Sequence, residues 1–270
     1  MYSFTDKDGN RDLTIEQSLS KLEGMFERVR RDKIMQCEPL SDEDEATLFL
    51  FVAAAHFRTP KIREHWKRQL GEAVELGDQM KTHIESLSPE EKAALRDDAM
   101  PPNGPTFSIE DLRPFAEQPL QRMLPIFVTA EANLLSYMTP TIFCTADDVF
   151  ITSDAPVVWF DPESYKLPRF YRNPALGSET IEVTMPIAPN RLLLLTHGRA
   201  TDGYVPIVSK IDIGVQLIDD VNRRTRFHCD EYFIFRSNEK KAIWLLRASS
   251  RRARSWSAKH RSTAGGQGVR

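Results

Sequence analysis

The chain has little cysteine and lacks the short motifs that identify several common enzyme classes. Its 270 residues include three cysteines, Cys37, Cys144 and Cys229, and no C-x-x-C pair. This pattern argues against a disulfide framework and favours a reducing compartment. There is likewise no H-E-x-x-H, no G-x-S-x-G and no glycine-rich phosphate loop, so zinc-protease, α/β-hydrolase and P-loop chemistry are not indicated.

Long hydrophobic runs are also absent. No apolar segment approaches the roughly 18 residues that a membrane helix needs, and the first ten residues are polar, unlike a signal peptide. Hydrophobic residues make up 41% of the chain and charged residues 28%, which is typical of a globular protein. We therefore expect a cytoplasmic protein that does not contact a membrane.

Charge is distributed unevenly along the chain. Residues 247–270 contain seven basic and no acidic residues. Because the whole chain has a net charge of −3, residues 1–246 have a net charge of −10. We predict a flexible basic tail over residues 248–270, in which Arg251, Arg252 and Arg254 could contact nucleic-acid phosphates. The favoured alternative is a solubilising tail or one that folds back on the acidic body, since nucleic-acid-binding domains are usually basic themselves.

Residues 13–138 have the apolar spacing of successive helices. The first helix has a stripe of residues three and four positions apart: Ile15, Leu19, Leu22, Phe26 and Val29. Next, residues 46–57 are apolar nearly all round, which predicts a buried central helix. We expect the acidic run 41–45 to cap that helix rather than to bind calcium, because it lacks the spacing of a calcium loop.

A third long helix is predicted over residues 62–87. Prolines then divide residues 108–138 into two or three helical pieces, with a kink near Pro125. Arg58 follows the buried helix directly and precedes a Thr-Pro break. Its guanidinium either caps the helix or pairs with an acid, or else it points into a pocket and binds an anion.

After residue 140 the pattern changes to strands. Residues 141–145 and 149–152 flank a short acidic turn and predict a β-hairpin. Further strands are expected at 181–185, 192–195 and 231–236, with one long helix over 210–227. The predicted fold class is α+β: an N-terminal helical bundle, then a mixed or antiparallel sheet with the long helix packed on it. We expect a helical region (1–140) and a strand-rich region (141–247) that form one cooperative domain.

Asn222 lies on the apolar stripe of the late helix, three and four residues from its apolar neighbours. A buried amide without partners costs about 1–3 kcal/mol, so it must find some. We favour a structural amide that holds a loop, with the Ser153-Asp154 turn as its expected partner. The alternative is an amide that binds a ligand.

The segment V-F-I-T-S-D-A-P-V (149–157) places a hydroxyl and a carboxylate, Ser153 and Asp154, at the end of an apolar strand. The structural interpretation is a turn held by local hydrogen bonds. The functional interpretation makes Asp154 a metal ligand or general base, and Asp147, Asp148 and Asp161 could extend it to a two-metal site. No histidine stands at motif spacing to Ser153, so a serine nucleophile has weak support.

Four fragments in order resemble a known bacterial family: F-R-T-P after the buried helix, F-I-T-S-D-A-P-V, P-I-A-P before a leucine-rich strand, and V-N-R-R-T. The family is catalogued as domain of unknown function 4238, and the likeness runs from about Leu13 to Ser237. The residues that match its characteristic positions are Arg58, Ser153, Asp154, Pro156, Pro186, Pro189 and Asn222. Members usually begin with a His-x-Val-Pro-like segment, so the resemblance implies a shortened member or a start assigned too far downstream.

Two hypotheses follow for the molecular function, which the resemblance leaves unknown. In the first, the Ser153-Asp154 turn, Arg58 and Asn222 form a polar pocket for a metal or an anionic ligand, with phosphoester hydrolysis as one chemistry. In the second, the same residues form a structural hub of a non-catalytic interaction module. The sequence identifies no cofactor, and nucleic acid is a possible partner only through the tail.

Overall fold

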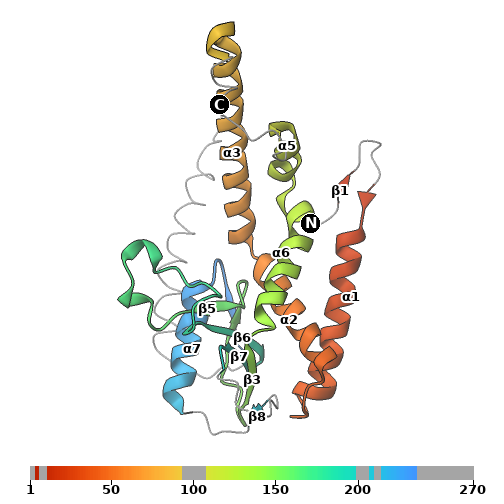
Figure 1. The fold of residues 1–270 in the computed structure, drawn as a ribbon. Coiled ribbons are helices and arrows are strands. Elements are labelled where there is room, and N and C mark those ends of the chain that lie inside the picture. Colours follow the sequence, from red (N-terminus) through yellow and green to blue (C-terminus); the bar gives the residue numbers. More distant parts are fainter. Residues whose placement is uncertain (1–3, 6–10, 93–107, 199–206, 210–213, 236–270) are drawn as a thin grey trace, which may run out of the picture. The chain divides into compact units, whose positions relative to one another are not determined.

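The computed structural model describes residues 4–5, 11–92, 108–198, 207–209 and 214–235 (Figure 1). The chain divides into two compact units, Met1–Ile234 and Phe235–Arg270. Almost all described residues belong to the first unit, and the basic tail with Arg251, Arg252 and Arg254 lies outside the described residues. No helix in the described ranges is long and apolar enough to cross a bilayer.

The N-terminal part is helical, as predicted. Its elements are α1 (Thr14–Val29), the π-helical turn η1 (Arg30–Ile34), α2 (Asp42–Phe57), α3 (Pro60–Ser86), α5 (Ile109–Glu117) and α6 (Pro119–Leu135). The segment with several prolines forms two helices that meet at Gln118, so the predicted division into pieces is confirmed. Pro125 lies inside α6, which continues through it.

Helix α2 occupies the centre of the core. Ser41 caps it: its Oγ accepts a hydrogen bond from the Asp44 amide at 3.2 Å, and the Asp44 carboxylate accepts one from the Ser41 amide at 3.0 Å. This confirms the capping role of the acidic run. The helix is buried on several sides, and its buried residues are Thr47, Leu48, Phe49, Val52, Ala53 and Ala54. Figure 1 shows α6 running beside it.

The strand-rich part contains a five-stranded mixed sheet in the order β5-β6-β7-β3-β8. The strands are β5 (Val158–Phe160), β6 (Glu182–Ala188), β7 (Arg191–Thr196), β3 (Thr139–Cys144) and β8 (Ile207–Ser209). All neighbours are antiparallel except β3 and β8. Two short pairs accompany it: β1 (Phe4–Thr5) with β2 (Arg11–Asp12), and β4 (Thr152–Ser153) with β9 (Phe233–Ile234). The α+β prediction is therefore confirmed.

The hairpin predicted around residues 146–148 is wrong. β3 pairs with β7 and β8, and the following segment does not return along it. Instead, the amides of Val149 and Phe150 both donate to the Pro189 carbonyl at 2.9 Å, and β4 pairs with β9 from the other end of the chain. The local pattern identified segments that form strands. It contains no information about β7 and β9, the distant strands with which these segments pair instead of with each other.

The sheet is covered on both faces. Neighbouring residues of β7 point to opposite sides: Leu193 and Leu195 join the core that includes α2 and α6, whereas Leu192 packs with Val221 of α7 (Val215–His228). Arg224 of α7 lies over the Phe160 ring at 3.7 Å and pairs with Glu182. The predicted long helix thus packs on the sheet, although residues 210–213 of its expected range lie outside the described residues.

Two adjacent leucines in α6 test where the core lies. Leu135 is fully buried, whereas Leu134 is 53% exposed. Leu135→Ala should lower the free energy of unfolding by about 2–5 kcal/mol, because it removes buried surface and leaves a cavity. Leu134→Ala should change it by less than about 0.5 kcal/mol. Urea denaturation of both variants provides the measurement, and equal losses would contradict this packing.

Candidate functional site

The Asp154 carboxylate is held by backbone amides from the far end of the folded unit. Its Oδ1 accepts from the Asp230 amide at 2.9 Å, and its Oδ2 accepts from the Glu231 and Tyr232 amides at 2.6 and 3.4 Å. The Asp154 amide in turn donates to the Tyr232 carbonyl at 3.2 Å. We call residues 230–232 the amide cradle. Three converging N–H dipoles create a positive environment that suits a carboxylate.

Ser153 supports the same turn. Its side chain is buried at 8% exposure, and its Oγ accepts from the Ala155 amide at 3.2 Å. This is the local side-chain-to-backbone hydrogen bond typical of serine in turns. Since β4 pairs Ser153 with Phe233, the turn lies directly against the amide cradle.

The amide cradle also contacts the helical part. Oδ2 of Asp230 accepts from the Lys61 amide at 3.2 Å, in the first turn of α3. Thr59, the N-cap residue of α3, makes no side-chain cap hydrogen bond. The Asp230 carboxylate, from a distant segment, therefore provides the acceptor for a backbone amide in the first turn of this helix. Nearby, burial and the positive charge of Lys61 lower the pKa of His228.

Asn222 is buried at 5% exposure and uses both ends of its amide. Oδ1 accepts from the Ile151 amide at 3.1 Å, and Nδ2 donates to the Val149 carbonyl at 2.9 Å. The prediction that Asn222 contacts the Ser153-Asp154 turn is therefore wrong. Asn222 instead holds residues 149 and 151, which directly precede that turn. Its amide supplies the donor and the acceptor that a neighbouring strand would otherwise provide.

Arg58 belongs to a different contact. Its guanidinium pairs with Glu23 of α1, which ties α2 to α1 at the end of the buried helix. Arg58 stands three residues before Lys61, in the connection between α2 and α3. Ser153 and Asp154 belong to the segment whose residues 149 and 151 are held by Asn222 of α7. The described link between Arg58 and the Asp154 carboxylate is indirect and runs through Lys61 and Asp230.

Two of the four aspartates considered for a two-metal site, Asp154 and Asp161, have different hydrogen-bond partners. Asp161 accepts hydrogen bonds from the Thr180 and Ser178 hydroxyls at 2.8 Å each, and these bonds lower the pKa of its carboxyl group. Asp154 is engaged by the amide cradle. In the described part of the chain, no group of three or more His, Cys, Asp or Glu side chains could hold a metal ion.

A buried ionisable pair that was not predicted from the sequence lies between α2 and α6. Nδ1 of His56 lies 2.8 and 3.1 Å from the two carboxylate oxygens of Glu131. Glu131 is 4% exposed; burial raises the pKa of its carboxyl group, and the hydrogen bond from His56 partly offsets that rise. The His56 ring packs 4.5 Å from the Trp159 ring of β5, so the pair joins two helices to the sheet.

A signal for this pair existed in the sequence. Glu131 falls seven residues after Leu124 and four before Leu135, which places an acid on the buried face of α6. An acid at such a position needs a partner, and a histidine on a neighbouring buried helix is a suitable one.

An exposed arm projects between β5 and β6. It comprises residues 162–176 and contains two short 3₁₀ turns, Ser164–Lys166 and Arg169–Tyr171 (Figure 1). Asp161 fixes its base through the hydrogen bonds described above, and His197 Nε2 lies 2.8 Å from the Leu176 carbonyl at its end. It carries three aromatic and three basic side chains close together, in the order Tyr165, Lys166, Arg169, Phe170, Tyr171 and Arg172. This cluster was not among the sites predicted from the sequence.

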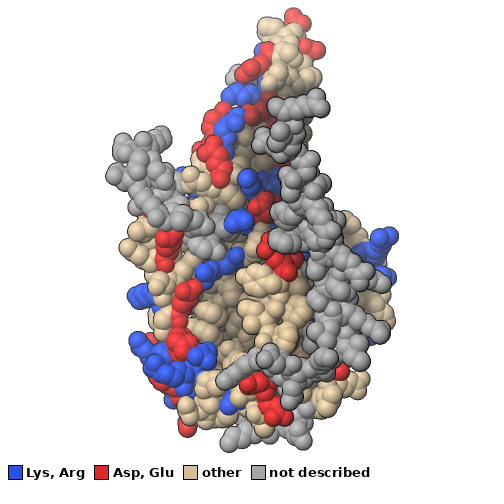
Figure 2. Space-filling model, turned by 180° about the vertical axis from the view of Figure 1, so that it is seen from behind, with Lys and Arg blue, Asp and Glu red and all other residues tan. Residues whose placement is uncertain are grey.

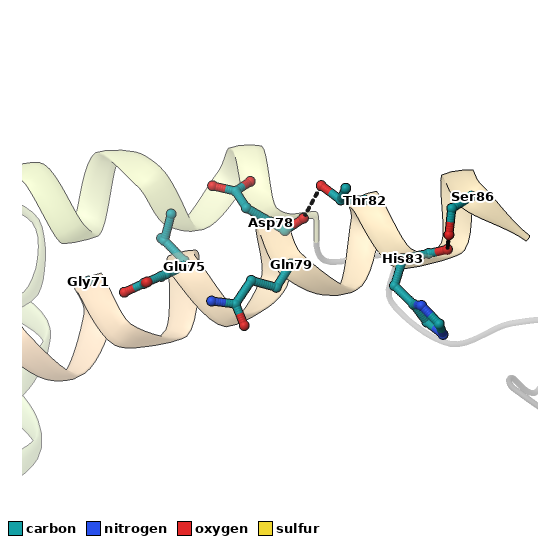
Figure 3. A pocket seen from close by; sticks show the side chains of 8 residues that line it. Gly71, Glu75, Asp78, Gln79, Thr82, His83 and Ser86 are labelled. Carbon is teal, nitrogen blue, oxygen red and sulfur yellow. Dashed lines mark hydrogen bonds between the residues drawn. The ribbon is translucent and has the colours of Figure 1, made fainter.

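A shallow hollow lies on α3, away from these residues (Figure 3). Its lining residues all come from this one helix: Gly71, Val74, Glu75, Asp78, Gln79, Thr82, His83 and Ser86. Two of its polar groups are used within the helix, where Thr82 and Ser86 donate to the Asp78 and His83 carbonyls. The hollow contains none of the predicted site residues.

Comparison with known proteins identifies the family. The model of the family described as "Protein of unknown function (DUF4238)" matches residues 1–239, which include Arg58, the Ser153-Asp154 turn and Asn222. The chain belongs to this family. No curated protein and no solved structure gives a significant match to the chain. The resemblance seen in the sequence is thus confirmed, and the function has to be argued from the geometry of this DUF4238 member.

Asn222 provides a direct test of its structural role. Asn222→Ala should destabilise the protein by about 1–3 kcal/mol for each backbone group, at Val149 and Ile151, that loses its partner without reaching water. Gln216→Ala, an exposed change in the first turn of the same helix, is the matched control and should have little effect. Urea unfolding of both variants gives the comparison. An unchanged stability of Asn222→Ala would show that the amide does not hold this segment.

Proposed function

We propose that this protein is a non-catalytic binding module in which Ser153, Asp154, Asn222 and Arg58 hold the fold. The observation that carries the proposal is the engagement of both Asp154 carboxylate oxygens by the backbone amides of residues 230–232. A general base or metal ligand needs an oxygen that faces substrate or ion. Here the converging N–H groups engage both carboxylate oxygens, and their positive ends would oppose an approaching cation.

The alternative, hydrolysis or ligand binding at this turn, has less support. The Ser153 hydroxyl accepts from a backbone amide within its own turn, and a serine nucleophile needs a base to take its proton. Arg58 pairs with Glu23, and Asn222 spends its donor and acceptor on the backbone. Asp154, Asn222 and Arg58 therefore each have a structural partner on a different segment, and Ser153 has one within its own turn.

Replacing Asp154 distinguishes a structural role of the turn from a role in ligand binding or hydrolysis. Asp154→Asn should lower the free energy of unfolding by about 1–3 kcal/mol, because an amide offers one acceptor oxygen and turns its NH₂ group toward backbone donors. Asp147→Asn, the same chemical change at an exposed turn residue, should cost less than about 0.5 kcal/mol. Urea unfolding measures both effects.

Calorimetric titration with Mg²⁺, Mn²⁺ and inorganic phosphate completes this experiment. We expect none of them to bind the parent protein at the turn. If the parent binds one of these ions, and a fully folded Asp154→Asn variant does not, the turn is a ligand site and the structural proposal fails.

The arm is the surface that we propose for contact with a protein partner. Tyr165, Phe170 and Tyr171 are 68%, 87% and 66% exposed, next to basic side chains. Aromatic residues and arginine are enriched in protein–protein contacts and often carry most of their energy. Figure 2 shows positive and negative side chains mixed over the described surface of the face that it draws, which favours a protein over a duplex nucleic acid.

Capture from a bacterial extract tests the arm. The immobilised parent protein should retain a partner that a Phe170→Ser/Tyr171→Ser variant retains much less, because large aromatic anchors are lost. Tyr137→Ser, at a tyrosine that is 80% exposed just after α6, is the control and should retain it fully. Equal retention by all three proteins, or none by any, would contradict the role of the arm.

A bacterial source and a cytoplasmic location remain predictions for this protein. The prediction that the helical and strand-rich regions form one cooperative domain can be tested by unfolding experiments. Nucleic-acid contact through Arg251, Arg252 and Arg254 also remains a prediction.

A further inference from the structure

Two cysteines that are far apart in the sequence meet at the surface of the core. Cys37 Sγ lies 3.3 Å from Cys144 Sγ, although the two residues are 107 positions apart in the sequence. Cys37 follows the π-helical turn η1, and Cys144 is the last residue of β3. Both are only partly buried, so small molecules can reach them. The sulfurs need to approach from 3.3 Å to about 2.05 Å to form a disulfide bond.

Cys37 occupies a backbone position that usually belongs to glycine. Its φ is 58°, the only positive value at a non-glycine residue among those described. The Glu38 amide donates to the Lys33 carbonyl at 2.9 Å, and the Cys37 amide donates to the Ile34 carbonyl at 3.2 Å. This is the Schellman arrangement at a helix end, where glycine or asparagine is the common residue. A non-glycine residue in this conformation is strained, and residues strained in this way cluster at functional sites.

Arg191 joins the two cysteines. It pairs with Cys144 across β3 and β7, and its Nη2 lies 3.8 Å from Cys37 Sγ. The same guanidinium donates to the Met35 carbonyl at 3.2 Å and, through Nε, to the Ile34 carbonyl at 3.4 Å. Arg191 thus fixes the turn above the end of β3 and places a positive group beside the Cys37 sulfur. Thiols with a cationic neighbour and access to solvent are the ones that oxidise.

We propose that Cys37 and Cys144 form a reversible disulfide on reaction with a peroxide, which makes this pair an oxidation site of the protein. The Cys37 sulfur attacks one oxygen of hydrogen peroxide. The O–O bond breaks, a sulfenic acid forms, and the departing hydroxide takes the thiol proton as water. Cys144 then attacks the Cys37 sulfur. The S–S bond forms, the S–O bond breaks, and the second hydroxide leaves as water with the Cys144 proton. Two thiols lose two electrons in total, and one peroxide becomes two waters.

The disulfide would join the connection between α1 and α2 to the central strand pair of the sheet. It closes a long loop of chain, and cross-links of long loops constrain the unfolded state most. The oxidised protein should therefore unfold at a higher temperature than the reduced protein. This inference is independent of the role proposed for Asp154 and of the arm.

The test uses the full chain, reduced, desalted and treated with a stoichiometric amount of hydrogen peroxide. Remaining thiols are alkylated, and peptides are mapped without reductant. We expect one linked pair of peptides, containing Cys37 and Cys144, while the buried Cys229 is recovered as a thiol. Dithiothreitol should reverse both the link and the rise in unfolding temperature.

Three variants control the experiment. Cys144→Ser and Cys37→Gly should each abolish the link and the temperature shift, and glycine suits the left-handed backbone at position 37, so the fold should persist. Cys229→Ser should form the same link as the parent. A link that contains Cys229, a link between two molecules, or equal alkylation of all three cysteines after peroxide treatment would overturn the proposal.

Discussion

The hydrogen bonds of the Asp154 carboxylate organise the contact between the helical part and the strand-rich part of this protein. They fix three consecutive amides near the end of the folded unit and thereby bring β9 against β4. With the cradle in place, the Asp230 carboxylate reaches the first turn of α3. A carboxylate in one turn thus determines where a second carboxylate can cap a helix. Without Asp154, these amides would need water or another acceptor, because each backbone N–H group requires a hydrogen-bond partner.

Polar groups also connect the layers on either side of the sheet. On one side, Asn222 of α7 replaces a missing strand neighbour for the segment 149–151. On the other, His56 and Glu131 join α2 and α6 next to Trp159. Buried groups of this kind add little net stability compared with apolar packing, but a wrong arrangement would leave them unpaired at considerable cost. They therefore make the fold specific more than they make it stable.

This arrangement changes the meaning of the family pattern. A serine, an aspartate and an arginine at positions that match a family pattern invite an active-site interpretation. Here the Ser153 and Asp154 side chains accept hydrogen bonds from backbone amides, and Arg58 pairs with the opposite charge of Glu23. The chemically exposed features lie elsewhere, in the aromatic arm after β5 and in the two neighbouring cysteines beside Arg191. These are the surfaces for which we propose contact with a partner and reaction with peroxide.

The sequence by itself determined the local features of this protein. Apolar spacing located the helices and the leucine-rich strand, the acidic run 41–45 predicted a cap before the buried helix, and the position of Asn222 on an apolar stripe predicted a buried amide that holds a neighbouring segment. These features depend on neighbours within one or two helical turns, so a linear pattern contains them. Tertiary structure alone decided which distant segments meet: β4 with β9 instead of a hairpin, residues 230–232 around Asp154, His56 with Glu131, and Cys37 with Cys144. Each of these contacts joins residues 75 or more positions apart, and their choice results from competition among many alternative partners for the same hydrogen bonds and the same core volume, which no local pattern records.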